Sequence, residues 1–295
     1  MKKKNLFTFP AMAAVAALAL TGCVNDDGAA GGSGVEVSGV DEAAVALLPA
    51  EVKEAGKLVV GTDAEYPPNE FKDASGQPAG WSVDLVEAIG AKLGLEVEWE
   101  IMSFDSILPR VEEGALSLGS SSFTDTLERQ KTVDFVNYLQ AGTAWAAPKG
   151  STVDPDNACG MKVSVQSGTI QHTDDLPARS KACEDAGKAA IDILQFETQA
   201  EATQALLDGR ADAMAADSPI TGDAIAKSEG ELVAIGKLYD AAPYGFPFQK
   251  GSGVGKAVQA ALQSLMDDGS YEKLLKSAGL ESGALKEATI NAGNS

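Results

Sequence analysis

The chain has 295 residues, of which 44% are hydrophobic and 22% charged, which is typical of a folded protein and too apolar for a disordered one. Its formal net charge of −20 argues against a nucleic-acid-binding protein, which needs a basic surface. One histidine and three cysteines are too few soft ligands for an ordinary zinc site, so we expect no metal and no cofactor.

The N-terminus has the features of an export signal. Lysines at positions 2–4 precede an apolar stretch at 6–20, which is shorter than the about 20 residues of a membrane span but suits a signal peptide. The sequence Leu-Thr-Gly-Cys that ends at Cys23 resembles the lipobox of bacterial lipoproteins. We therefore predict a signal peptide at 1–22 and a lipid on Cys23 that anchors the exported chain at the outer face of the cell membrane. Ordinary cleavage nearby, with a spare thiol, is the alternative.

Residues 23–46 form the next segment, which is rich in Gly, Ala, Ser and Asp. This composition predicts a flexible tether after the lipidated cysteine, with the folded part beginning near Leu47. Two cysteines remain beyond it, Cys159 and Cys183, and an even remainder in an exported protein predicts a disulfide. Two buried free thiols are the alternative.

Strands and helices then alternate along the chain. Strands are predicted at 57–61, 96–101, 116–122, 162–165, up to Gln195, 211–216 and 232–235. Helices are predicted at 82–93, 103–113, 198–207 and 254–266, the first three ending at glycines. The pattern indicates an α/β protein whose parallel sheets are covered on both faces. Residues 145–149 and 236–245 are candidate crossovers between two halves.

The loop at 61–68 follows the first strand, and ligands of α/β proteins bind at the carboxyl ends of strands. Asp63 and Tyr66 offer a carboxylate and an aromatic face, which suit a polar or cationic group. The alternative is a loop that only positions Pro67 and Pro68.

A second candidate cluster lies at 121–129, where hydroxyl residues lead to Arg129. A guanidinium presents two donors to a carboxylate, and nearby hydroxyl and N–H groups fill the remaining lone pairs. The alternative is a capped helix start with Arg129 in a solvated run of charges.

A third candidate is Asp217, which follows a buried strand at the expected start of a helix. Its carboxylate can pair with a ligand ammonium group. It can also serve merely as an N-cap ahead of Pro219.

Several short motifs follow one another along the chain in a characteristic order. They are Gly-Thr-Asp-x-x-Tyr-Pro-Pro at 61–68, Gly-Trp-Ser-Val-Asp-Leu at 80–85, Thr-x-Thr-x-Glu-Arg at 124–129, Val-Asp-Phe at 133–135, Ser-Gly-Thr at 167–169 and Tyr-Gly at 244–245. Together with the lipobox, they resemble the family 3 extracellular solute-binding proteins, the polar amino-acid receptors of ABC importers. The resemblance covers roughly residues 58–280.

The resemblance implies a two-lobe clamshell, each lobe a mostly parallel sheet flanked by helices, with two crossover hinge segments. Lobe 1 would comprise 47–147 and 240–295, and lobe 2 would comprise 148–239. The ligand would bind in the cleft at the hinge.

The resemblance also implies roles for the candidate residues. Arg129 would grip the α-carboxylate of an amino acid with help from Ser122 and Thr124, and Asp217 would take the α-ammonium. N–H groups of the turn at 167–169, which includes Thr169, would also suit an anion. The remaining ligand-binding residues would face the ligand side chain, with Tyr66 and Phe104 packing on it and Asp63 and Gln166 reading its polar end.

We therefore expect an exported receptor that delivers a polar or cationic amino acid to a membrane permease, acts as a monomer and is not an enzyme. Alternatives are a dehydratase-like enzyme of the same fold acting on a small carboxylate, a binding protein for an acidic or other polar solute, and a sensor domain. His172 has no nucleophile motif beside it, which favours a surface or capping role.

Overall fold

The computed structural model describes residues 39–294 of the chain. The predicted signal peptide at 1–22, the lipidation site at Cys23 and the first part of the tether lie outside the described residues. Within residues 39–294, no helix has both the length and the apolar character that a membrane span requires.

The folded part begins earlier than the sequence predicted. Helix α1, Glu42–Ala46, lies where the tether was expected to continue, and α2, Ala50–Ala55, follows it. Asp41 caps α1, because its carboxylate accepts hydrogen bonds from the next turn of backbone at 3.0 and 3.1 Å. Ala44 is fully buried where α1 packs on α8 (Val254–Asp267). A cap and one buried alanine therefore order a segment that has the composition of a tether.

Lobe 1 is built on a parallel sheet of strand order β5–β1–β6. Its strands are β1 (Lys57–Thr62), β5 (Glu96–Ile101) and β6 (Leu118–Gly119). Helices packed around it are α3 (Trp81–Leu93), α4 (Phe104–Glu112), α8 and α9 (Ser270–Ser277). Strand β6 is shorter than the predicted 116–122, and Ser122, three residues beyond its end, adopts a φ of 51°.

A small antiparallel sheet carries the loop that follows β1. Its strands are β2 (Glu65–Tyr66), β3 (Glu70–Lys72) and β4 (Pro78–Ala79), in the order β2–β3–β4. The bond between Pro67 and Pro68, in the turn from β2 to β3, is cis. The side chain of Tyr66 is buried, and it packs against lobe-2 residues such as Ile220.

Lobe 2 contains the parallel strands β8 (Lys162–Gln166), β9 (Asp192–Phe196) and β10 (Ala213–Asp217). Its helices are α5 (Leu176–Asp185), α6 (Gln199–Leu207) and α7 (Ser218–Lys227). Thr198 and Glu201 form a capping box at the start of α6. The predicted disulfide between Cys159 and Cys183 is present, with the two Cα atoms 5.5 Å apart, and it ties α5 to the segment before β8.

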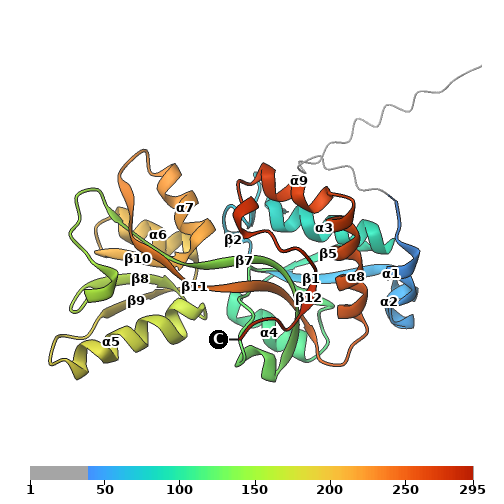
Figure 1. Ribbon diagram of the computed structural model, residues 1–295, viewed down its shortest axis with the longest axis horizontal. Helices are drawn as coiled ribbons and strands as arrows, with labels where there is room; N and C mark the ends of the chain where they lie inside the picture. Colours follow the sequence, from blue (N-terminus) through green and yellow to red (C-terminus); the bar gives the residue numbers. More distant parts are fainter. Residues whose placement is uncertain (1–38, 295) are drawn as a thin grey trace, which may run out of the picture. The chain divides into compact units, whose positions relative to one another are not determined.

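Two long antiparallel strands connect the lobes, as Figure 1 shows. They are β7 (Val133–Pro148) and β11 (Leu232–Gln249), and the sheet order is β11–β7–β10–β8–β9, with β12 (Thr289–Ile290) also paired to β7. The sequence predicted only a short strand at 232–235. The second crossover predicted at 236–245 lies in an irregular part of β11, whose register with β7 shifts on either side of Tyr239.

Along each of these two strands, the buried side chains at one end pack in the core of one lobe and those at the other end pack in the core of the other lobe. On β7, Tyr138 and Ala141 belong to the core of lobe 1, whereas Trp145 and Ala147 belong to a core of lobe 2. On β11, Tyr239 packs against that lobe-2 core and Tyr244 lies in the lobe-1 core. The fold is thus the predicted two-lobe α/β architecture, with both connections in extended backbone.

Candidate binding site

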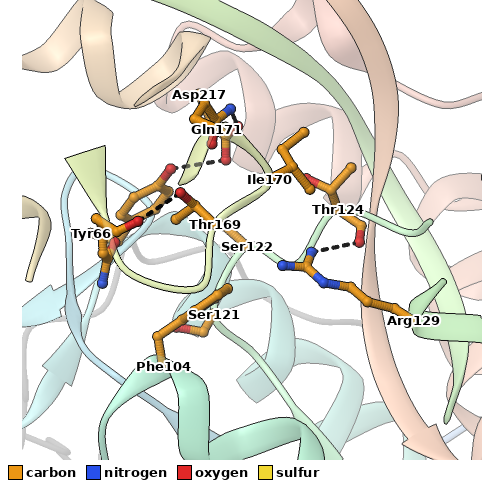
Figure 2. A pocket seen from close by; sticks show the side chains of 11 residues that line it. Tyr66, Phe104, Ser121, Ser122, Thr124, Arg129, Thr169, Ile170, Gln171 and Asp217 are labelled. Carbon is orange, nitrogen blue, oxygen red and sulfur yellow. Dashed lines mark hydrogen bonds between the residues drawn. The ribbon is translucent and has the colours of Figure 1, made fainter. Parts of the chain in front are cut away.

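A small cavity of about 10 Å³, which has room for about one water molecule, lies where the two lobes meet. Side chains from β2, α4, the loop after β6 and the carboxyl ends of β8 and β10 surround it (Figure 2). The lining residues are Tyr66, Phe104, Ser121, Ser122, Thr124, Arg129, Gln166, Thr169, Ile170, Gln171 and Asp217. The ends of parallel strands from both lobes therefore open onto one small space, most of whose lining residues are polar.

All but one of the residues predicted to bind ligand line this cavity. The exception is Asp63, which lies directly behind two lining residues, Ser121 and Gln166. Sequence reasoning did not assign ligand roles to Ser121, Ile170 and Gln171. Ser121 lies within the second cluster and Gln171 just past the Ser-Gly-Thr turn, so position along the chain was the only signal available for them.

Arg129 occupies the start of a short helical turn, Arg129–Lys131, after the serine-rich loop. Its Nη1 donates to Thr124 O at 2.8 Å, and its Nη2 donates across the lobes to Gly168 O at 3.0 Å. The guanidinium also lies 5.8 Å from the ring centroid of Phe104 and 5.5 Å from that of Phe123. Burial lowers the pKa of Arg129, while the charge of Asp217 opposes that shift. Because neutral carbonyls and rings hold it, Arg129 can still neutralise a ligand carboxylate.

Asp217 ends β10 and is the N-cap residue of α7, but its side chain makes no capping hydrogen bond. Its Oδ2 accepts from the hydroxyls of Tyr66 at 2.9 Å and Tyr244 at 2.7 Å, and its Oδ1 accepts from Gln171 Nε2 at 2.8 Å. Burial raises the pKa of this carboxyl, and the three hydrogen bonds oppose the rise. The side chain therefore serves the cavity and not the helix start (Figure 2).

Asp63 is buried and hydrogen-bonded on both oxygens. Ser121 Oγ donates to its Oδ1 at 3.0 Å, and Gln166 Nε2 donates to its Oδ2 at 2.8 Å from the other lobe. Burial raises the pKa of Asp63, and these donors counteract the rise. The site therefore has a second acid, set behind the cavity wall.

Two amide oxygens at the cavity, Gln166 Oε1 and Gln171 Oε1, are buried without a hydrogen-bond partner. Leaving such an acceptor unmatched typically costs about 1–3 kcal/mol. The nitrogens of the same amides are bound to Asp63 and Asp217, which fixes the direction of each side chain. The cavity therefore presents free acceptors beside its two acids, an arrangement that suits a ligand with many N–H donors.

The turn at 167–169 differs in part from its expected role. The N–H of Ser167 donates to Phe196 O, and that of Gly168 donates to His172 Nδ1, so neither is available to an anion. Only Thr169 of this turn lines the cavity. His172, for which a surface or capping role was expected, is half-buried and caps this turn.

Residues 58–280 match the family described as bacterial extracellular solute-binding proteins, family 3. The arginine-binding protein ArgT of Corynebacterium glutamicum is 44% identical over 248 residues, which is 83% of this chain and 82% of ArgT. This chain belongs to family 3 of the bacterial extracellular solute-binding proteins. The family predicted from the sequence motifs is therefore confirmed. The curated relatives are named as binding proteins for amino acids, not as enzymes.

Solved structures agree with this family assignment. An ancestral arginine-binding protein bound to arginine matches with a TM-score of 0.69 and 32% identity over 75% of this chain and 97% of that one. An ancestral arginine-binding protein bound to glutamine matches with a TM-score of 0.68 and 32% identity over 75% of this chain and 97% of that one. As a family 3 solute-binding protein, the chain has the two-lobe fold of amino-acid-binding proteins and acts outside the cytoplasm.

Proposed function

We propose that this solute-binding protein captures L-arginine between its lobes and delivers it to the permease of an ABC importer. The observation that carries the proposal is the pairing of one guanidinium, Arg129, with two buried carboxylates, Asp217 and Asp63, at a single small cavity. Arg129 matches an α-carboxylate, and Asp217 matches an α-ammonium. Asp63 then remains for a cationic side chain, so the charges of the site and of arginine balance.

The hydrogen-bonding groups of the site support a guanidinium in particular. A guanidinium has five N–H donors and needs more acceptors than one carboxylate provides. Asp63 and the unpaired oxygen of Gln166 supply acceptors on one side, and Tyr66 and Phe104 provide aromatic faces for the flat cation. In this conformation Gln166 Nε2 occupies the position at Asp63 Oδ2 that the ligand side chain would take.

Closure of the lobes around the ligand follows from the cross-lobe contacts. Arg129 bonds Gly168, Tyr66 bonds Asp217, and Gln166 bonds Asp63, each pair joining opposite lobes. We assign 47–147 and 240–295 to lobe 1 and 148–239 to lobe 2, with hinges in β7 and β11. A ligand that touches both lobes stabilises the closed state, because only that state offers it both sets of contacts.

Attachment to the membrane would come from the lipid on Cys23. The net charge of −20 gives the chain no electrostatic affinity for anionic headgroups, so acyl chains would have to provide the anchor. The receptor would act as a monomer held near the membrane by its tether. It would deliver one amino acid each time its lobes close. Mass spectrometry of the membrane fraction, with a diacylglyceryl group on an N-terminal Cys23, tests the anchor.

Isothermal titration calorimetry of the exported chain from residue 24 tests the ligand. We expect L-arginine to bind in the micromolar range or tighter and L-glutamate to bind at least 100-fold more weakly. Asp63→Asn should reduce the preference for arginine over glutamine at least 10-fold, whereas the exposed Asp73→Asn should leave it unchanged. Equal affinity for glutamate and arginine would overturn the proposal.

We propose further that the bound amino acid leaves unchanged. The oxygens of Asp217 already accept three hydrogen bonds, which does not suit a general base that must gain a proton. NMR spectra of arginine incubated with the protein should stay constant, and a new product would instead favour the dehydratase-like enzyme.

A further inference from the structure

The chain continues past the matched segment 58–280 with a C-terminal tail, residues 281–294, that returns to lobe 1. A short turn, Glu281–Gly283, begins the tail, and β12 then pairs with the first part of β7 (Figure 1). In that pairing Thr289 faces Asn137 and Ile290 faces Val136. The tail therefore lies on one of the two strands that join the lobes.

Three consecutive residues near the end of the tail, 291–293, are each hydrogen-bonded to the rest of the protein. Asn291 exchanges two hydrogen bonds with the backbone of Phe135 and donates its amide to Asp134 Oδ1 at 2.8 Å. The N–H of Ala292 donates to Asn137 Oδ1 at 2.9 Å. This spacing brings Gly293 to the loop that precedes Arg129.

Asp125 is the point of contact between the tail and that loop. It is fully buried, and its carboxylate accepts from Gly293 N at 2.9 Å, Asn137 Nδ2 at 2.9 Å and Gln130 Nε2 at 2.7 Å. Gln130 Nε2 also donates to Gly293 O at 3.0 Å, so tail and loop exchange hydrogen bonds in both directions. A Cβ atom on Gly293 would lie 1.9 Å from Asp125 O, which shows how closely the two backbones approach.

The residues bonded to the tail flank those that hold Arg129. Thr124, next to Asp125, accepts the Arg129 Nη1 hydrogen bond on its carbonyl, and Gln130 directly follows Arg129. The loop is attached to β11 by the Thr124–Tyr244 bridge and by two backbone hydrogen bonds, one donated by Asp125 N to Pro243 O and one accepted by Phe123 O from Gly245 N. The tail adds a contact at Asp125 to the others that hold the loop, among them the hydrogen bond from Asn69 to Ser122 and the stacking of Phe123 on Phe104.

We infer that the C-terminal tail is a positioning element for the ligand carboxylate: by bonding Asp125 and Gln130, Gly293 holds the loop that aims Arg129 into the cavity. The inference rests on the proposed function in that Arg129 receives the carboxylate. Holding a binding group in its bound geometry before the ligand arrives raises affinity, because the ligand need not order it.

The variant Gly293→Ala tests the inference, because it adds one methyl group against Asp125 and leaves the cavity untouched. We expect arginine affinity to fall about 10-fold by calorimetry, with the thermal midpoint within a few degrees of the wild type. Gln259→Ala is the matched control: it removes a tail hydrogen bond, to Ala288 O at 2.8 Å, far from the loop, and should change affinity less than 2-fold. Equal effects of the two variants would contradict positioning.

Two further measurements separate positioning from simple stabilisation. In an Arg129→Ala background, Gly293→Ala should weaken binding by less than 2-fold, because the group that it misplaces is gone. In ligand-free protein, amide exchange at 124–131 should rise at least 10-fold in Gly293→Ala and stay constant in Gln259→Ala.

The exchange measurement needs no ligand, so it also distinguishes the two proposals from each other. If arginine fails to bind but the loop loosens in Gly293→Ala, the assigned ligand is wrong and the tail still holds the loop. If arginine binds and the loop does not loosen, the role of the tail is wrong.

Discussion

At the scale of single residues, the site depends on how Arg129 is held. Two backbone carbonyls and two aromatic rings surround its guanidinium, and none of these carries a negative charge. The charge of Asp217 acts on it only from across the cavity. A bound carboxylate would therefore be the direct counter-ion of Arg129, which gives this residue a larger share of the affinity than a surface arginine has.

Replacing Arg129 by alanine should weaken every amino-acid ligand at least 100-fold in calorimetry. Arg129→Lys should recover only part of the loss, because an ammonium cannot donate to Thr124 O, Gly168 O and a carboxylate with the same planar fork. The control is Arg110→Ala, which removes a partly exposed ion pair with Glu100, outside the cavity lining, and should leave affinity unchanged. A wild-type affinity in Arg129→Ala would remove the basis of the proposed site.

Sequence reasoning identified the charged residues of the site but not their partners. Asp63, Arg129 and Asp217 each follow a strand within a recognisable motif, so their positions were predictable. The Tyr66–Asp217 hydrogen bond joins residues 151 positions apart, and it exists only because the lobes meet. Gln171 was missed because a glutamine after a turn has no local signature of ligand binding.

At the scale of elements, strands and helices with strong local patterns were predicted within one or two residues. Strand β5 alternates polar and apolar residues and matches its predicted range of 96–101, and α3 ends at Gly94 as predicted. The long β11 was not predicted, because Pro243, Gly245 and Pro247 interrupt its pattern. Its hydrogen bonds come from pairing with β7, a partner that local sequence does not reveal.

Strand β3 carries an unusual buried acid, Glu70, beneath the site. Its Oε2 accepts from Ser82 Oγ, while its Oε1 has no hydrogen-bond partner. Burial raises the pKa of Glu70 to about 8, with the charges of Asp63 and Asp217 adding to the rise and Ser82 and Ser122 opposing it. In the unfolded chain the same carboxyl ionises near its ordinary pKa of 4.5.

Glu70 should therefore make the protein less stable as pH rises. Between about pH 4.5 and 8 the folded state keeps a proton that the unfolded state has lost, so the free energy of unfolding falls across this interval and levels off above it. Urea unfolding from pH 5 to 9 should show a decline in the free energy of unfolding that is smaller in Glu70→Gln than in the wild type by roughly 4 kcal/mol. The exposed Glu54→Gln should follow the wild type, and parallel curves for wild type and Glu70→Gln would contradict this account.

At the scale of the whole molecule, charge should affect how fast ligand arrives. The chain has a net charge of −20, and a hollow of about 670 Å³ adjoins the binding cavity, with Ile170 lining both. Acidic residues of both lobes and of β11 line this hollow, namely Glu128, Asp174, Asp175 and Asp240. A cation that approaches the cleft therefore enters a region of negative potential, which raises its association rate at low ionic strength.

Stopped-flow measurements with intrinsic tryptophan fluorescence should show this steering for L-arginine. Raising the ionic strength from about 0.01 to 0.3 M shortens the Debye length from roughly 30 Å to less than 10 Å, so the association rate should fall several-fold while dissociation changes little. Replacing Asp174 and Asp240 by asparagine should reduce this salt dependence. L-glutamine has no net charge and should associate at a rate independent of salt. If arginine behaves as glutamine does, the acidity of the molecule serves solubility alone and the ligand finds the cleft by unassisted diffusion.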